Sequence, residues 1–426
     1  MPVSVFHHVF GPESWVFQGT EIMRNWIARA VFVAVAGFAV SAMAADWPHF
    51  LGPNSNGTSP ETGINKAWND KKPAQLWTVK MSDNGFAGPS VADGKVFIID
   101  HIGDNDVIRA IDLITGKQVW ETPYAEPGPP DQGNFARSTP TYDNGKLYTL
   151  SRLGLLNCYN AKDGKNLWSR NIATDFKGQK PKWHYSMSPI VDGNNLIVIP
   201  GGANACVAAL NKESGATIWQ GGGSDAPGYA TPAIATIAGK KQYLVMTIAG
   251  LIGVDPADGK LLWSFPWKTR MDVNAAMPVM VGEDTIFITS GYGHGCTVAK
   301  IADGKAEKVW ENKEIQSHFS TPVFFDGNIY GTTDPGDLVC LDPKTGKALW
   351  RQPGFEKGGI IVVDGTIIAM NGKDGDAIMV ELKPDAYKEL GRFKPIGGQS
   401  WTAPIIADGK LIIRNKATTL GCFDLK

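Results

Sequence analysis

The sequence predicts an all-β protein, an eight-bladed β-propeller built from four-stranded antiparallel blades. A motif that ends in tryptophan recurs along the chain of 426 residues, and a second motif with a tight turn alternates with it. Glycine (49 residues) and proline (27 residues) are abundant, and long helical periodicities are absent. Many short strands joined by turns, repeated at the spacing of a blade, are typical of a propeller.

The first motif is Ala110-Ile-Asp-Leu-Ile-Thr-Gly-Lys-Gln-Val-Trp120. Its tryptophan recurs in copies that end at Trp168, Trp219, Trp263 and Trp350, with a looser copy at Trp310. We expect the aspartate or asparagine to accept hydrogen bonds from turn amides, and the glycine to supply the positive φ of a tight hairpin. The tryptophan offers a flat apolar surface for docking against the neighbouring blade.

The second motif marks the start of each inner strand and contains an Asp-Gly or Asn-Gly hairpin turn in most copies. Eight such starts are found, at Pro89, Pro140, Pro189, Pro232, Pro278, Pro322, Ile360 and Pro404. The eighth blade ends after its third strand, near Cys422. We therefore expect residues 76–79 to supply its outer strand and to close the ring without an open sheet edge.

The chain is predicted to have three parts. Residues 1–44 are interpreted as an upstream segment plus a secretory signal, with Met23 as the initiator and cleavage after Ala44. No cysteine stands directly after the small residues of the cleavage site, so a lipid anchor is not predicted, and no transmembrane span is expected after cleavage. Residues 45–73 lead into the propeller of residues 74–426, and the protein is expected to be periplasmic or secreted.

Composition and spacing exclude several kinds of site. The net charge of −1 gives no reason to expect a nucleic-acid partner. The five cysteines suggest either disulfides or small buried residues of the strands, and we predict buried packing. Histidines do not occur at metal-ligand spacing, so no metal-binding or catalytic residue is assigned.

These repeats resemble the tryptophan-docking motifs of quinoprotein-type propellers, the pyrroloquinoline-quinone (PQQ)-like repeat family, over roughly residues 74–426. The stretch from Asp46 to Gly57 is similar to the N-terminal stretch of many secreted PQQ-like repeat proteins. Two branches of this fold are the PQQ-dependent alcohol and glucose dehydrogenases, and BamB, a subunit of the outer-membrane β-barrel assembly machinery. The resemblance implies either quinone chemistry or a protein-binding role.

A candidate ligand site follows from the position three residues before each inner strand, which is expected to line the channel mouth. Around the ring this position holds Phe86, Arg137, Ser186, Tyr229, Ala275, Phe319, Lys357 and Trp401, with His184, Tyr185, Asn274 and His318 beside it. We interpret all of these except Ser186 and Ala275 as candidate ligand-binding residues, with the aromatic and basic members suited to a flat or anionic ligand. The alternative is that the aromatic side chains only fill the channel.

Three functions stay open at this point. A dehydrogenase of the resembled family would have adjacent cysteines, calcium-binding carboxylates and a longer chain, all missing here, so no cofactor is required, although PQQ stays an open candidate. A binding or assembly scaffold with a periplasmic or envelope protein partner needs no catalytic group, and the proline-rich connection 121–135 is a candidate contact. Capture of an anionic or aromatic small ligand or a glycan is the third. We predict a non-enzymatic scaffold.

Overall fold

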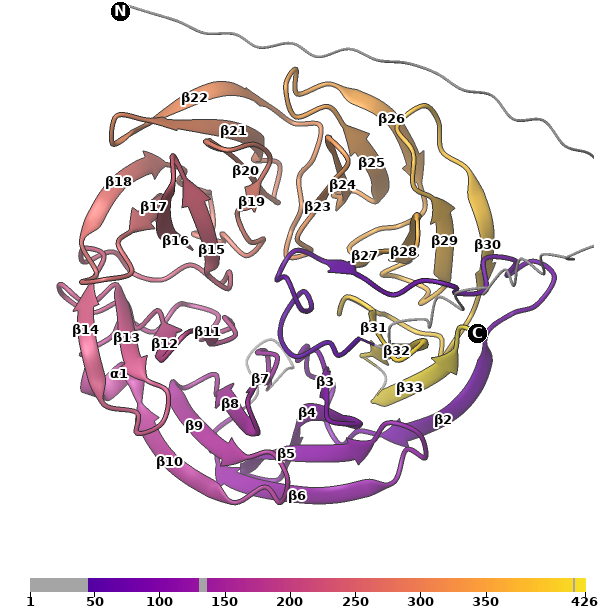
Figure 1. Cartoon of the computed structure of the whole chain (residues 1–426), viewed down its shortest axis with the longest axis horizontal. Coiled ribbons are helices and arrows are strands. Elements are labelled where there is room, and N and C mark those ends of the chain that lie inside the picture. The colour runs from indigo at the N-terminus through magenta and orange to yellow at the C-terminus, as the bar shows by residue number, and fades with distance from the viewer. Residues whose placement is uncertain (1–44, 130–135, 417) are drawn as a thin grey trace, which may run out of the picture. The chain divides into compact units, whose positions relative to one another are not determined.

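The computed structural model describes residues 45–129, 136–416 and 418–426, which form eight antiparallel sheets arranged as a ring (Figure 1). Each sheet begins with a short inner strand and ends with an outer strand at the rim. The prediction of an all-β, eight-bladed propeller is confirmed. The predicted secretory signal lies outside the described residues.

The first four blades each use four consecutive strands. Blade 1 contains β3 (Ser90–Ala92), β4 (Lys95–Ile102), β5 (Asn105–Asp112) and β6 (Gln118–Ala125). Blade 2 contains β7 (Thr141–Asp143), β8 (Lys146–Leu150), β9 (Leu155–Asn160) and β10 (Asn166–Asn171), followed by the short helix α1 (Ile172–Asp175). Blade 3 contains β11 (Ile190–Asp192), β12 (Asn195–Val198), β13 (Val207–Asn211) and β14 (Thr217–Gly221). Blade 4 contains β15 (Ala233–Ile237), β16 (Lys240–Met246), β17 (Gly250–Val254) and β18 (Leu261–Pro266).

The last four blades include the two strands from the N-terminal part of the chain. Blade 5 contains β19 (Val279–Met280), β20 (Thr285–Ser290), β21 (Gly295–Ala302) and β22 (Lys305–Asn312). Blade 6 contains β23 (Val323–Phe325), β24 (Asn328–Thr333), β25 (Asp337–Leu341) and β26 (Ala348–Pro353). Blade 7 contains β27 (Ile360–Val363), β28 (Thr366–Met370), β29 (Ala377–Glu381) and β30 (Glu389–Phe393), with β1 (Thr58–Ser59) parallel to β27. Blade 8 contains β31 (Ile405–Ala407), β32 (Lys410–Asn415), β33 (Thr419–Asp424) and, as its outer strand, β2 (Ala74–Lys80).

Strand β2 joins the two ends of the described chain, because it pairs antiparallel with β33 over its whole length. A buried apolar cluster reinforces this seam: it combines residues of blades 7, 8 and 1 with Trp47, Ile64 and Trp68 of the N-terminal segment. Trp68 is fully buried and packs edge-on against Phe393 of β30, with ring centroids 5.1 Å apart. The segment before β2 is therefore part of the core of the ring.

The motif tryptophans connect adjacent blades. The indole of Trp120 donates a hydrogen bond to the carbonyl of Ala161 (3.2 Å), and Trp219 donates to Pro256 (2.9 Å). The same contact to the next blade is made by Trp77, Trp168, Trp310 and Trp350. Trp263 differs, because its indole donates to Gln242 in its own blade.

Five of these six docking indoles, all except Trp350, lie against the motif glycine of the following blade. A Cβ atom built on Gly259 would lie 2.5 Å from a ring carbon of Trp219, and one on Gly164 would lie 2.5 Å from Trp120. These glycines also have positive φ, 77° at Gly259 and 74° at Gly164. The glycine is thus required twice, for the turn and for the close approach of the indole.

The polar residue of the motif has the expected role. Oδ1 of Asp112 accepts hydrogen bonds from the backbone amides of Ile114 (3.2 Å) and Thr115 (2.8 Å). Asn211 accepts equivalent bonds two and three residues ahead. These bonds fix the turn that carries the docking glycine.

The cysteines and the proline-rich connection can now be placed. All five cysteines are buried and free. Glu121–Ala125 belong to strand β6, which corrects the expectation of a loop beginning at residue 121. Residues 130–135 of that connection lie outside the described part of the chain.

Prediction on blade docking. Replacing Gly259 by alanine introduces both an unfavourable positive φ and a collision with Trp219, whereas Gly304 (φ 72°) has open space at its Cβ position. We expect Gly259→Ala to lower the melting temperature more than Gly304→Ala, by the equivalent of about 1–3 kcal/mol of overpacking. Differential scanning calorimetry measures both variants. Equal losses would show that the glycine serves the turn alone.

Candidate functional site

A cavity of about 550 Å³ opens where the connections from outer to inner strands meet around the axis. The backbone before each inner strand supplies its wall. All eight positions predicted three residues before the inner strands line it: Phe86, Arg137, Ser186, Tyr229, Ala275, Phe319, Lys357 and Trp401. The sequence rule therefore identifies the cavity wall, and binding of a ligand there stays a prediction.

One side of the cavity is aromatic. The rings of Phe86 and Trp401 are stacked with centroids 5.4 Å apart, and Phe319 lies 5.2 Å from Trp401. His318 stacks on Phe319 at 5.1 Å, and Tyr292 meets His318 edge-on at 4.2 Å. Blades 1, 5, 6 and 8 thus contribute to one continuous aromatic surface.

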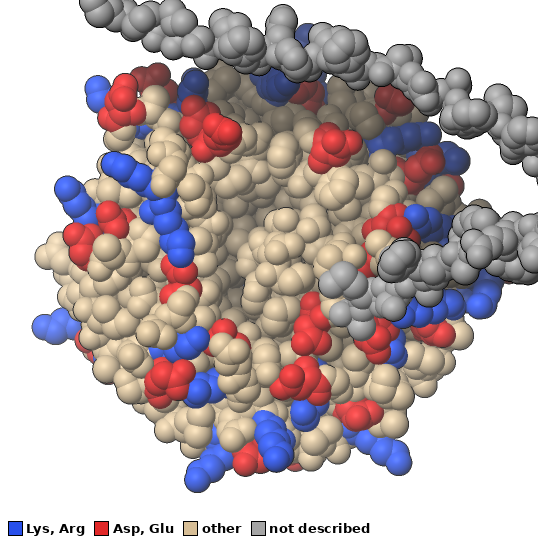
Figure 2. Space-filling view, viewed as in Figure 1, with Lys and Arg blue, Asp and Glu red and all other residues tan. Residues whose placement is uncertain are grey.

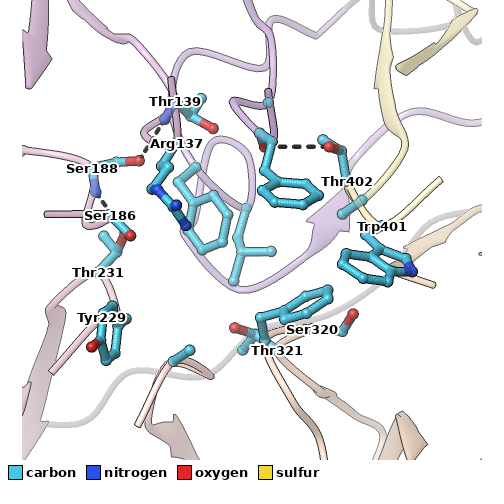
Figure 3. A pocket seen from close by; sticks show the side chains of 18 of the residues that line it. Arg137, Thr139, Ser186, Ser188, Tyr229, Thr231, Ser320, Thr321, Trp401 and Thr402 are labelled. Carbon is cyan, nitrogen blue, oxygen red and sulfur yellow. Dashed lines mark hydrogen bonds between the residues drawn. The ribbon is translucent and has the colours of Figure 1, made fainter. Parts of the chain in front are cut away.

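The charged side chains of the cavity are all cationic. The ammonium groups of Lys416 and Lys357 lie 5.4 and 5.7 Å from the centroid of Trp401. Arg137 reaches into the cavity from the opposite side, beside the wall that carries Tyr229 (Figure 3). No aspartate or glutamate is among the lining residues, all of which belong to the described part of the chain. The cavity is therefore suited to negatively charged groups.

A set of side-chain hydroxyls holds the wall together. The amide of Thr139 donates to Oγ of Ser188 (2.9 Å), and the amide of Ser188 donates to Oγ1 of Thr231 (2.9 Å) (Figure 3). The amide of Met277 donates to Oγ1 of Thr321 in the same way (3.0 Å). Each bond joins the connection before one inner strand to the connection before the next. These bonds fix the backbone from which the cavity side chains project.

A buried ion pair supports the connection that carries Phe86. The guanidinium of Arg414 is completely buried and donates to Asp83 (2.7 Å) and to the carbonyl of Ala87 (2.7 Å). Burial raises the pKa of Asp83 to about 6, because the attraction of Arg414 only partly offsets the loss of solvation. Arg414 thereby joins β32 to the chain on both sides of Phe86.

The floor of the cavity comes from the N-terminal segment. We call residues 45–59 the plug. Trp47, Phe50 and Leu51 of the plug line the cavity, and Trp47 pairs with Val91 of β3 in an isolated bridge. A second cavity lies on the other side of the plug, lined by plug residues 46, 48–49 and 53–56. The plug therefore separates two axial spaces.

Three predicted ligand-binding residues do not line the cavity. Tyr185 is buried in the core and donates to the carbonyl of Pro200 (2.9 Å). The amide of Asn274 is fully buried and donates to the carbonyls of Thr247 and Trp267. His184 also lies outside the cavity wall. The side chains of Asn274 and Tyr185 thus lie behind the wall, where their hydrogen bonds fix the backbone.

The sequence rule missed several lining residues. They are Trp183, Tyr292, Lys416 and the plug residues Trp47, Phe50 and Leu51. Lys416 follows β32 and lies in the turn between the second and third strands of its blade. Turns of this kind open on the same face as the connections, so their positions in the repeat could have identified Lys416 as a lining residue. The plug residues carry no repeat signal.

We expect the imidazole of His318 to be neutral at physiological pH. Burial and then the neighbouring Lys357 ammonium lower its pKa, Asp334 opposes both effects, and the net pKa is about 4. The protonated form would place another positive charge beside Lys357. His318 therefore provides a neutral flat surface and a hydrogen-bonding nitrogen to the cavity.

The donor set decides which cofactor the cavity can hold. The three cations and the aromatic surface suit a flat polyanion such as PQQ. No carboxylate lines the cavity, and in the described residues no group of three or more His, Cys, Asp or Glu side chains could hold a metal ion. The residues thus fit an organic anion and do not fit the calcium that accompanies a quinone in dehydrogenases.

Comparison with known proteins gives a family for this sequence pattern. A family model described as outer membrane protein assembly factor BamB matches residues 104–352, more than half of the chain. Among curated relatives, the BamB of Burkholderia pseudomallei is 24% identical over 80% of this chain and 84% of its own length. The BamB of Yersinia pestis is 23% identical over 66% of this chain and 72% of its own length.

This chain shares its fold with solved structures from both branches, BamB and the quinoprotein dehydrogenases. BamB from Moraxella catarrhalis superposes with a TM-score of 0.61 at 14% identity, covering 83% of this chain and 99% of that one. The quinohemoprotein alcohol dehydrogenase from Comamonas testosteroni gives 0.68 at 15% identity, covering 90% and 81%. Structural likeness alone does not separate a scaffold from a dehydrogenase.

Prediction on His318. Between pH 6.5 and 4 the unfolded chain binds a proton at this imidazole that the folded protein does not, so folding stability from this group falls as the pH falls through that window. We expect His318→Asn to lose less stability than the parent between pH 7 and pH 5, by about 1–2 kcal/mol after solvent screening. Thermal melts at both pH values measure the difference. An NMR midpoint for the His318 imidazole near 6.5 would contradict the assignment.

Proposed function

Because the chain belongs to the family of outer membrane protein assembly factor BamB, we propose that it is a non-enzymatic propeller that acts as a binding scaffold in outer membrane protein assembly. The observation that carries this proposal is the family match over more than half of the chain, together with BamB relatives that align with most of it. A scaffold needs presented surfaces rather than a reacting group. The cavity wall, with its cations and aromatic rings but without carboxylates, supports that expectation.

The proposed place of action is the periplasmic side of the outer membrane. The relatives are named as outer membrane protein assembly factors, and the secretory signal expected before Ala45 would bring the chain out of the cytoplasm. Among the described residues, no helix is long and apolar enough to cross a membrane. We propose an envelope protein as the partner.

A second candidate function belongs to the cavity. Three cations converge on an aromatic surface without a neighbouring carboxylate, which favours capture of a flat or extended anion. The ligand would stack on Trp401 while Lys416, Lys357 and Arg137 hold its negative groups. PQQ, an acidic glycan and the carboxylate end of a peptide share this chemistry.

Prediction on the scaffold role. In a bacterium that carries this gene, deletion should lower the amount of folded outer membrane β-barrel proteins, and the intact gene should restore it. Heat-modifiable migration of these proteins in gel electrophoresis measures the folded fraction. Complementation with Gly304→Ala, a change in open space, should restore the level as well. Unchanged folded β-barrel proteins after deletion would remove the support for an assembly role.

Prediction on the cavity. Titration of residues 45–426 with PQQ, followed by absorbance and melting temperature, should show saturable binding that calcium does not strengthen. Replacing one charged contact, as in Lys416→Gln, should weaken binding about ten-fold. Trp401→Ala should weaken it as well, whereas Lys347→Gln, an exposed lysine on a turn of β25–β26 away from the cavity wall, should not. Equal binding by all variants would show that PQQ does not use the cavity.

A further inference from the structure

The inner strands of the propeller present one backbone edge to the axis. In an antiparallel pair, residues alternate between pairs that exchange hydrogen bonds and pairs whose backbone groups point away from the partner strand. Each inner strand closes its hairpin with a bonded pair, so the preceding residue directs its N–H and C=O to the axis. Every second residue before it does the same, which in the longer strand β15 includes Ile234, two residues before Thr236. These axis-facing residues are Val91, Tyr142, Val191, Ile234, Met280, Phe324, Val362 and Ile406.

The plug of this chain already binds to part of this edge. Trp47 and Val91 exchange two backbone hydrogen bonds of 2.9 and 2.8 Å. The amide of Tyr142 donates to the carbonyl of Pro48 (2.8 Å), and the amide of Val362 donates to that of Gly57 (2.9 Å). An extended segment therefore pairs with the inner edges of blades 1, 2 and 7.

The inner edges of blades 3 to 6 are not covered in this way. Among the described residues, no hydrogen bond uses the axis-directed backbone groups of Val191, Ile234, Met280 and Phe324. These four residues line the second cavity, which has a volume of about 720 Å³ and lies beside the plug. An unpaired strand edge of this kind is a template for another strand.

The side chains around this second cavity are mainly apolar. Ile234 is 42% exposed, and Val191, Met280 and Phe324 are partly exposed. No lysine or arginine lines the cavity, and its charged lining residues are Asp46 and Asp143. Figure 2 shows one face of the molecule, with a central hollow surrounded by uncharged residues and charged groups farther out.

We propose that this second cavity is a docking groove for an extended segment of a partner polypeptide, which pairs with the inner strand edges of blades 3 to 6. The plug continues into the groove, so the partner would extend a backbone interface that the chain already makes with its own residues. Alternate side chains of the segment would be apolar, to cover Ile234 and Phe324. A basic residue would suit the end near Asp46, whereas Asp143 already pairs with Lys212 (2.6 Å). The site goes beyond the proposed cavity function, because the plug separates it from Trp401 and the three cations.

The test uses residues 45–426 and a labelled peptide of alternating threonine and valine with an N-terminal lysine. Its control has the same side chains with N-methylated valines, which cannot pair along that edge. Fluorescence anisotropy should show saturable binding of the first peptide and at least five-fold weaker binding of the second. Equal affinities would overturn pairing with a strand edge.

A matched pair of variants locates the contact. Ile234→Pro removes the axis-directed N–H, which the sheet ladder does not use, and prolines are tolerated at such edges. It should weaken the peptide at least five-fold, and more than Ile234→Ala, which removes the side chain and keeps the N–H. Trp401→Ala should leave peptide binding unchanged even if it abolishes anion capture. If Trp401→Ala weakens peptide binding as much as Ile234→Pro does, the assignment of the peptide to the groove is wrong.

Two further outcomes are decisive. If near-ultraviolet circular dichroism shows that Ile234→Pro is misfolded, the comparison of the two peptides on the parent protein decides alone. If sedimentation shows a dimer of this chain that the peptide dissociates, the groove is occupied by a second copy and the proposal of a partner segment is wrong.

Discussion

The contact between a tryptophan of one blade and a glycine of the next joins five of the eight pairs of neighbouring blades, and most of the ring depends on it. The indole of Trp219 donates to Pro256 and lies on Gly259, so the turn of blade 4 is shaped by a residue of blade 3. Gly259 has no side chain to hold the indole away. Asp255, the polar residue four positions earlier, fixes the turn that carries this glycine. Blades that give and receive such contacts stabilise one another rather than forming independent sheets.

Closing that ring determines what happens at its axis. Strand β2 comes from before the first blade to complete the last one, and the residues that precede it lie at the axis, where they bond to the inner strands of blades 1, 2 and 7. The plug thereby divides the channel. On one side lies a cavity with cations and stacked aromatic rings, and on the other lies a groove with open strand edges and two carboxylates. The plug thus separates two spaces of different chemical character.

The parts that repeat could be predicted from the sequence, and the parts that occur once could not. Tryptophan spacing and inner-strand starts specify the eight blades, and the position three residues before each start identifies eight residues of the cavity wall. Residues beside that position were less predictable: Tyr185 and Asn274 turn behind the wall and bond to backbone carbonyls, because the side chains of neighbouring residues in an extended backbone point in different directions. The floor made by Trp47, Phe50 and Leu51 depends on one tight turn in the plug. The two-residue strand β1 is set by its tertiary partner β27, a signal that local sequence does not carry.

The division of the channel is tested most directly by hydrogen exchange at the axis-facing amides, measured by NMR on residues 45–426 without any ligand. Amides paired with the plug, those of Val91, Tyr142 and Val362, should exchange slowly. The amides of Val191, Ile234 and Phe324 occupy equivalent positions and should exchange much faster, because nothing among the described residues pairs with them. Uniform protection around the ring, or uniform fast exchange, would contradict a plug that covers one part of the inner edge and leaves the other part open for a partner.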